Sequence, residues 1–128
     1  MGRMTYVVFP AFALCGCVAT TGNYRALAEG YPARSPDCSI EIFKDATPDR
    51  PFTAISHLNV HLEKTFFIPS DFASAVGELK RQGCLSGADG IVNIQERHSS
   101  YLETRIYNLS ATGIRFDRET APDVDRAK

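Results

Sequence analysis

Several features that mark broad classes of protein are missing from this sequence of 128 residues. Basic residues do not outnumber acidic ones, at 14 against 15, so the charge pattern of a nucleic-acid-binding protein is absent. No acidic tract is long enough to act as a charged tail with a dedicated partner. Neither the dinucleotide-binding glycine pattern nor a P-loop is present. We therefore expect one domain without a nucleic-acid partner.

Long hydrophobic runs are also lacking. Residues 5–14 (TYVVFPAFAL) form a run of ten without a charge. A membrane-spanning helix needs roughly 20 apolar residues, and Pro10 further weakens a continuous helix. Arg3 lies just before the run. A basic start followed by a short apolar stretch is typical of a secretory signal peptide.

The run ends in Leu14-Cys15-Gly16-Cys17, which resembles the bacterial lipobox: an aliphatic residue, a small residue, Gly or Ala, and the lipid-accepting cysteine. The resemblance implies cleavage between Gly16 and Cys17. It also implies a diacylglyceryl group on the Cys17 sulfur, because a thiolate is the nucleophile that accepts it, and an N-acyl chain such as palmitate. No other cofactor is expected. The chain would thus be a lipoprotein precursor.

Two alternatives exist for this segment: an ordinary cleaved signal followed by a disulfide framework, and an apolar N-terminal strand. The residue after the cysteine is Val18 and not Asp. By resemblance to enterobacterial sorting, this favours the outer membrane, with the protein facing the periplasm. Two or more acyl chains anchor a protein stably, whereas one binds a membrane only marginally.

Composition divides the chain into four segments. Residues 1–16 are the signal peptide. Residues 17–37 form the lipidated N-terminus and a flexible tether, because they are rich in small and turn-forming residues without periodicity. The folded domain should cover 38–116. Residues 117–128 are charged and are expected to form a flexible tail.

Within the domain, alternation predicts strands at 39–43 and 52–62, and apolar runs predict strands at 90–95 and 102–116. A turn is expected at 96–100. The predicted fold class is α+β, with one helix packed on a small, mainly antiparallel sheet in the order β-β-α-β-β.

Particular residues define the faces and the ends of these predicted elements. In 52–62, one face should be apolar, and the other should carry Ile55, His57, Asn59 and His61. The predicted helix begins at an N-cap, Ser70, with Asp71 in its first turn, and it ends at Gly87. Its apolar stripe consists of Phe72, Ala75, Val76, Leu79 and Gly83. Gly113 predicts a bulge or a close packing contact in the last strand.

This order of elements resembles the RcsF lipoprotein family and the broader YbjQ-like domains. The resemblance is carried by Pro51-Phe52, by the run 85–92 (LSGADGIV) and by Ala111-Thr-Gly113-Ile. It implies an outer-membrane lipoprotein that reports envelope stress through protein contacts. That family has four mature-domain cysteines in two disulfides. The expected mature chain has only Cys38 and Cys84 besides Cys17, so the family's disulfide pattern does not carry over.

Cys38 and Cys84 are predicted to pair, because the expected compartment is oxidising. The alternative is two buried free thiols, and no CxxC spacing indicates redox chemistry. His57 and His61 are weak metal candidates, since i and i+4 on a strand lie about 13 Å apart. Phe66 and Phe67 are either core residues or, if exposed, contacts for a partner.

No nucleophile–base constellation is found, so we expect a protein that is not an enzyme. The favoured hypothesis is a membrane-anchored envelope lipoprotein that binds a protein partner or senses stress. The alternative is an oligomeric ligand- or metal-binding lipoprotein of YbjQ-like type, in which His57 and His61 meet histidines of neighbouring subunits. A third hypothesis is a hydrolase that uses His98 and Ser99.

Overall fold

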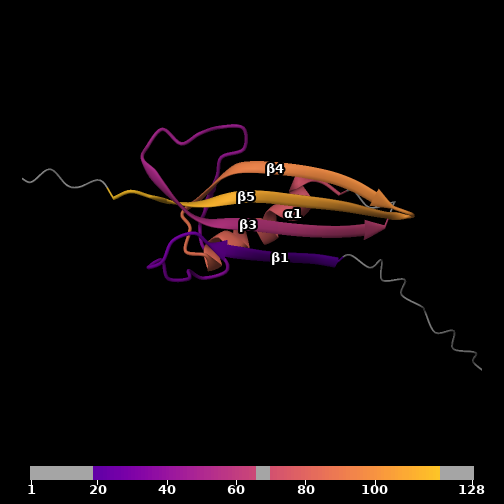
Figure 1. The fold of residues 1–128 in the computed structure, drawn as a ribbon, viewed down its shortest axis with the longest axis horizontal. Helices are drawn as coiled ribbons and strands as arrows, with labels where there is room; N and C mark the ends of the chain where they lie inside the picture. Colours follow the sequence, from indigo (N-terminus) through magenta and orange to yellow (C-terminus); the bar gives the residue numbers. More distant parts are fainter. Residues whose placement is uncertain (1–18, 66–69, 119–128) are drawn as a thin grey trace, which may run out of the picture.

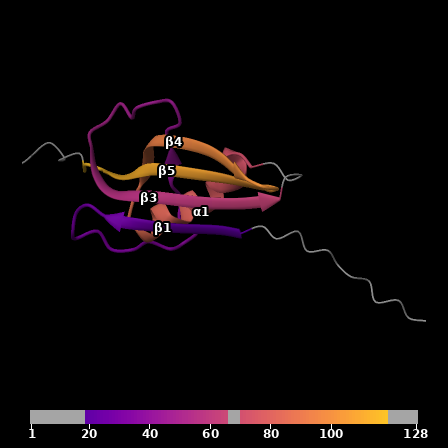
Figure 2. The same cartoon turned by 45° about the vertical axis from the view of Figure 1, so that its right-hand side comes forward.

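A computed structural model describes residues 19–65 and 70–118. One helix packs against one face of a mixed five-stranded sheet with the strand order β1-β3-β5-β4-β2 (Figures 1 and 2), which confirms the α+β class. The short β2–β4 pair is parallel, and the three other pairs of this sheet are antiparallel. The elements are β1 (Ala19–Ala26), β2 (Glu41–Ile42), β3 (Phe52–Thr65), α1 (Phe72–Leu85), β4 (Gly90–Tyr101) and β5 (Thr104–Phe116).

The first strand was not predicted, so the element order is β-β-β-α-β-β. β1 lies in the segment expected to be a tether and pairs with β3 from Ala19 opposite Glu63 to Ala26 opposite Ser56. Its residues are almost all exposed, so it carries no alternation of buried and exposed side chains that would reveal a strand. The pairing with β3 forms this strand, so part of the segment expected to be a tether belongs to the sheet.

The central strand β3 has the predicted alternation over most of its length. Leu58, Val60 and Leu62 are buried beneath the helix, whereas the histidines face the other way. The prediction fails at Ile55, which was placed on the polar face but is only 1% exposed. The register shifts between Ala54 and Ser56, and such a bulge changes the side on which the following residues point.

The helix begins one residue later than predicted, because Asp71 and not Ser70 is the N-cap. The Asp71 carboxylate accepts hydrogen bonds from the Ser74 N–H at 3.0 Å and the Ser74 hydroxyl at 2.7 Å. These bonds hold the pKa of Asp71 below its ordinary value. At the other end Gly87 has φ +87°, which confirms the predicted glycine stop.

β4 and β5 form a long hairpin that the sequence predicted only in part. Residues 96–100, expected to be a turn, continue β4 to Tyr101, and the chain reverses at Leu102 and Glu103. Residues 96–100 are polar because this part of the hairpin is exposed to solvent. The apolar side chains that would predict a strand are therefore absent from it. The Tyr107 hydroxyl donates to Glu96 across the pair. That bond lowers the pKa of the Glu96 carboxyl. The pKa of Tyr107 is raised, first by burial of its hydroxyl and then by the hydrogen bond to Glu96.

The predicted disulfide between Cys38 and Cys84 is present, with the two Cα atoms 5.8 Å apart. It joins the segment before β2 to the last turn of α1. The same segment is held to the helix by the Arg34 N–H, which donates to the Cys84 carbonyl at 2.9 Å. The C-terminal end of the helix is therefore fixed covalently and by hydrogen bonds.

Gly113 makes the close packing contact that the sequence predicted. A Cβ at this position would lie 2.1 Å from the Ser56 Oγ and 3.2 Å from the Ala88 Cβ. The Ser56 hydroxyl is fully buried and bonds the Ser86 Oγ at 2.8 Å, and Ser86 in turn donates to the Gly83 carbonyl. Any side chain at Gly113 would displace Ser56 from this bond.

We predict that Gly113→Ala lowers the free energy of unfolding by about 2–4 kcal/mol, through overpacking and a lost buried hydrogen bond. Urea unfolding measures the loss. Gly77→Ala is the control, because no atom lies within 4 Å of a Cβ there and alanine favours helix. In a Ser56→Ala background the cost of Gly113→Ala should fall. An equal cost in both backgrounds would show that Ser56 is not the cause.

Candidate functional site

The face of the sheet opposite α1, here called the open face, carries polar side chains around a shallow hollow of about 430 Å³. Side chains from β1, β3, β4 and β5 line it. Asn59 Nδ2 donates to Asn23 Oδ1 at 3.3 Å across the β1–β3 pair. The lining residues are Asn23, His57, Asn59, Val60, His61, Gln95, Arg97, Asn108, Leu109 and Ser110.

His61 is the most constrained group on the open face. Its Nδ1 lies 2.6 Å from Asn108 Oδ1, and its Nε2 lies 2.9 Å from Glu63 Oε1. Both partners are acceptors, so the ring fits best as an imidazolium that donates from both nitrogens. The hydrogen bond that the ring donates to Glu63, followed by the one to Asn108, raises the pKa of His61 above its ordinary value of 6.5. A ring held in this form has no free lone pair for a metal ion.

We predict that Glu63→Gln lowers the pKa of His61, because the variant removes the charged acceptor. Because the folded-state pKa is raised, His61 contributes stability that is fully present below an unfolded pKa of about 6.5 and is lost as the pH rises through the folded pKa. An NMR titration of the His61 ring measures its pKa. Urea midpoints measured across the pH range between the unfolded and folded pKa values measure the loss of stability. An unchanged titration in Glu63→Gln would contradict the assignment.

The outer side of β1, here called the outer edge, is the second feature open to a partner. In the part of the chain that the structure describes, no strand pairs with this side of β1. The Leu27 N–H donates to the Ile55 carbonyl at 2.8 Å, continuing the β1–β3 register. Since hydrogen-bonded pairs alternate in an antiparallel ladder, odd-numbered residues bond to β3, and even-numbered residues such as Tyr24 direct their N–H groups outward.

Exposed sheet edges usually carry features that block further pairing, such as proline, several charges or a bulge. β1 has no proline, a single charged residue in Arg25, and an uninterrupted register over eight residues. The opposite edge of the sheet is different. There β2 covers only Gly90 and Ile91, and the rest of β4 has no further partner strand among the described residues, but that stretch contains a register shift between Val92 and Gln95 and the charged residues Glu96 and Arg97. β1 is therefore the edge at which an added strand fits.

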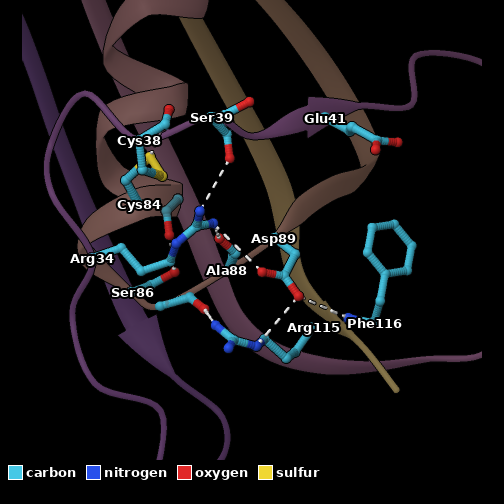
Figure 3. A network of polar contacts seen from close by, with 12 residues as sticks. Arg34, Cys38, Ser39, Glu41, Cys84, Ser86, Ala88, Asp89, Arg115 and Phe116 are labelled. Carbon is cyan, nitrogen blue, oxygen red and sulfur yellow. Dashed lines mark hydrogen bonds and ion pairs between the residues drawn. A yellow bond between two sulfur atoms is a disulfide. The ribbon is translucent and has the colours of Figure 1, made fainter. Parts of the chain in front are cut away.

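A polar network at the C-terminal end of α1 joins segments far apart in the sequence (Figure 3). The Asp89 carboxylate lies between two guanidinium groups, 3.5 Å from Arg34 Nη1 and 3.3 Å from Arg115 Nε. Arg34 also donates to the Ala88 carbonyl and Arg115 to the Gly87 carbonyl. Cations at these carbonyls complement the negative end of the helix dipole. Both arginines are thus used in holding the fold.

A hollow of about 520 Å³ lies beside this network and is lined by arginines and carboxylates. Arg50 stacks on the Phe116 ring at 3.6 Å, and Arg34 is paired with Asp89. The hollow is lined by three arginines and three carboxylates, so its lining carries no excess positive charge for an anion.

The predicted site residues have different outcomes. Cys38 and Cys84 are bonded, and His57 and His61 both lie on the open face. No group of three or more potential metal ligands occurs among residues 19–65 and 70–118. The lipidation and cleavage residues and the phenylalanine pair lie outside the described residues: Gly16, Cys17, Phe66 and Phe67.

The residues of the proposed hydrolase do not form a dyad. His98 and Ser99 are consecutive in β4, and consecutive strand residues point to opposite faces. The His98 ring instead packs on Tyr107, with ring centroids 4.8 Å apart.

No helix in the described segments is long and apolar enough to cross a membrane. No protein-family model, curated protein or solved structure matches this chain. The resemblance to the RcsF and YbjQ-like domains therefore rests on the short motifs of the sequence and stays a prediction.

Proposed function

We propose that this protein is a membrane-anchored envelope lipoprotein that binds a protein partner without catalysis. Lipid on Cys17 would hold it at the outer membrane, facing the periplasm. The observation that supports binding is the outer edge of β1, where outward N–H and C=O groups of an eight-residue strand are available. A partner strand added there would extend the sheet through main-chain hydrogen bonds.

The open face would give such a partner specificity. Asn23 and Arg25 lie on β1 directly opposite Asn59 and His57, so a strand placed beside β1 brings its own side chains next to these polar groups. Cross-strand and diagonal pairs are the contacts that discriminate one added strand from another. A stress signal would reach the protein as a change in the partner that occupies this edge.

A metal-binding function is the weaker candidate. It would need histidines from neighbouring copies, and His61 is already engaged with Glu63 and Asn108. A second copy paired through β1 is the form of oligomer that the outer edge supports.

The test is photo-crosslinking in cells from a benzophenone amino acid at Arg25, compared between Tyr24→Pro and Tyr24→Ala. Proline removes the outward N–H of Tyr24 and leaves the bonds to β3 intact, whereas alanine keeps that N–H. We expect the adduct to persist in Tyr24→Ala and to fall at least tenfold in Tyr24→Pro, a change of about 1.4 kcal/mol or more in binding.

A crosslinker at Thr47 serves as the control position, because this residue lies in the loop between β2 and β3, away from β1. An adduct of equal yield in both Tyr24 variants would contradict strand addition at the outer edge. An adduct with the mass of two copies of this chain would support the oligomeric alternative instead.

A further inference from the structure

The end of the β4–β5 hairpin, Tyr101 and Leu102, is the most exposed apolar feature of the described chain. Tyr101 is 71% exposed and Leu102 is 85% exposed. Leu102 also has φ +53°, so the tight reversal holds its side chain at the very end of the sheet. We call these two residues the hairpin tip. The fold buries neither side chain, although both are large and apolar.

The hairpin tip lies at the same end of the sheet as the start of β1 (Figures 1 and 2). The registers place Ala19, Glu63, Ile106 and Ser99 in one row across the strands. Leu102 follows Ser99 by three residues, so it extends about 10 Å beyond this row. The row itself spans three strand spacings, about 14 Å.

The beginning of β1 also limits how far the domain stands from its anchor. Cys17 precedes Ala19 by two residues, a separation of about 7 Å at full extension. The lipid attachment point and the hairpin tip are therefore held within a short distance of each other, at one end of the sheet. A flexible tether over the whole of residues 17–37 would have left that end free to move away from the bilayer.

We propose that the hairpin tip inserts into the interface of the bilayer that holds the Cys17 lipid, so that the domain contacts the membrane at two points. This inference rests on the proposed lipid anchor. Tyrosine suits the headgroup level because its ring is amphipathic, and leucine suits the acyl boundary. The charges beside the tip balance, with Glu63 and Glu103 against Lys64 and Arg105, so insertion does not depend on anionic lipid.

Two contact points restrict the orientation of the domain to rotation about the line that joins them. With both ends of this row at the membrane, the strands rise from the bilayer, and the outer edge of β1 faces sideways along the surface. A partner strand in the periplasm could then pair with β1 by approaching parallel to the membrane surface.

The chain contains no tryptophan, so one introduced tryptophan gives an unambiguous fluorescence signal. The experiment uses the full-length lipoprotein carrying Leu102→Trp, reconstituted in vesicles of phosphatidylethanolamine and phosphatidylglycerol. We expect blue-shifted emission and strong quenching when lipids brominated on their acyl chains are included. Thr47→Trp, at the opposite end, should emit as in water and be quenched severalfold less. Tyr101→Trp provides a second reporter.

Intact-mass measurement of the same samples separates the possible failures. If the lipid mass is present and neither tip variant is quenched more than Thr47→Trp, the hairpin tip does not insert, and the lipid anchor stands. If the lipid mass is absent, the anchor and this inference both fail. Replacing phosphatidylglycerol with phosphatidylcholine should leave the quenching unchanged, and a large loss would overturn insertion through apolar contact.

Discussion

Cys17→Ala should abolish lipidation and leave an uncleaved precursor, because the variant lacks the thiolate that accepts the diacylglyceryl group. Intact-mass analysis of the membrane fraction measures both effects. The wild-type protein should begin at Cys17 and carry a lipid-sized mass. The variant should lack that mass and retain residues 1–16. This substitution has the largest expected effect of those considered, since it would remove the proposed anchor entirely.

The neighbouring Cys15 provides a matched control. It occupies the second place of the lipobox-like motif, where a small residue is required but no thiol chemistry takes place. Cys15→Ala should therefore be cleaved and lipidated as the wild type is. Loss of the lipid in Cys15→Ala, or a wild-type protein cleaved elsewhere and free of lipid, would contradict the anchoring proposal.

Removal of the disulfide is expected to have the second-largest effect. Cys38 and Cys84 are separated by 46 residues, and the chain-entropy model assigns a cross-link of this span about 4 kcal/mol. A domain of this size buries only a modest core, so that amount is a large share of its stability. The double variant Cys38→Ala/Cys84→Ala should therefore unfold at a much lower urea concentration than the oxidised wild type.

Adding a reductant separates the effect of the disulfide bond on stability from the effect of replacing the two cysteine side chains. The wild-type urea midpoint should fall in reductant, whereas the midpoint of the double variant should not change. The fold itself should survive, because Arg34 still donates to the carbonyls of residues 84 and 88 and keeps this segment on the helix. If the wild-type midpoint is insensitive to reductant, the cross-link does not stabilise the folded state as the entropy model requires.

The parts of the fold that the sequence predicted are those in which burial leaves a periodic pattern. Leu58, Val60 and Leu62 alternate because one face of β3 lies under α1, and the helix shows its stripe because Ala75 and Leu79 contact the sheet. The strand β1 and the outer half of β4 were missed or misassigned because nothing buries their side chains. Their pairing is a property of the assembled sheet.

The candidate surfaces, too, could be predicted only where a local sequence pattern reveals them. His57 and His61 were placed on the polar face of their strand, and the structure confirms that placement. The contact between His61 and Asn108 spans 47 residues, and that between Arg34 and Asp89 spans 55. No local pattern specifies such pairs. The outer edge of β1 was equally hidden, since an edge exists only once the strand order is known.

The two edges of the sheet differ in regularity and charge, and this difference has a consequence for stoichiometry. β1 presents an uninterrupted eight-residue edge, whereas the far edge consists of the two residues of β2 and the part of β4 beyond Ile91, which has a register shift between Val92 and Gln95 and the charges of Glu96 and Arg97. Two copies joined through β1 would form one continuous sheet with a two-fold axis, bounded at both ends by this interrupted and charged edge, which disfavours addition of a third copy. Growth by strand addition would then stop at a pair, with one added strand for each copy.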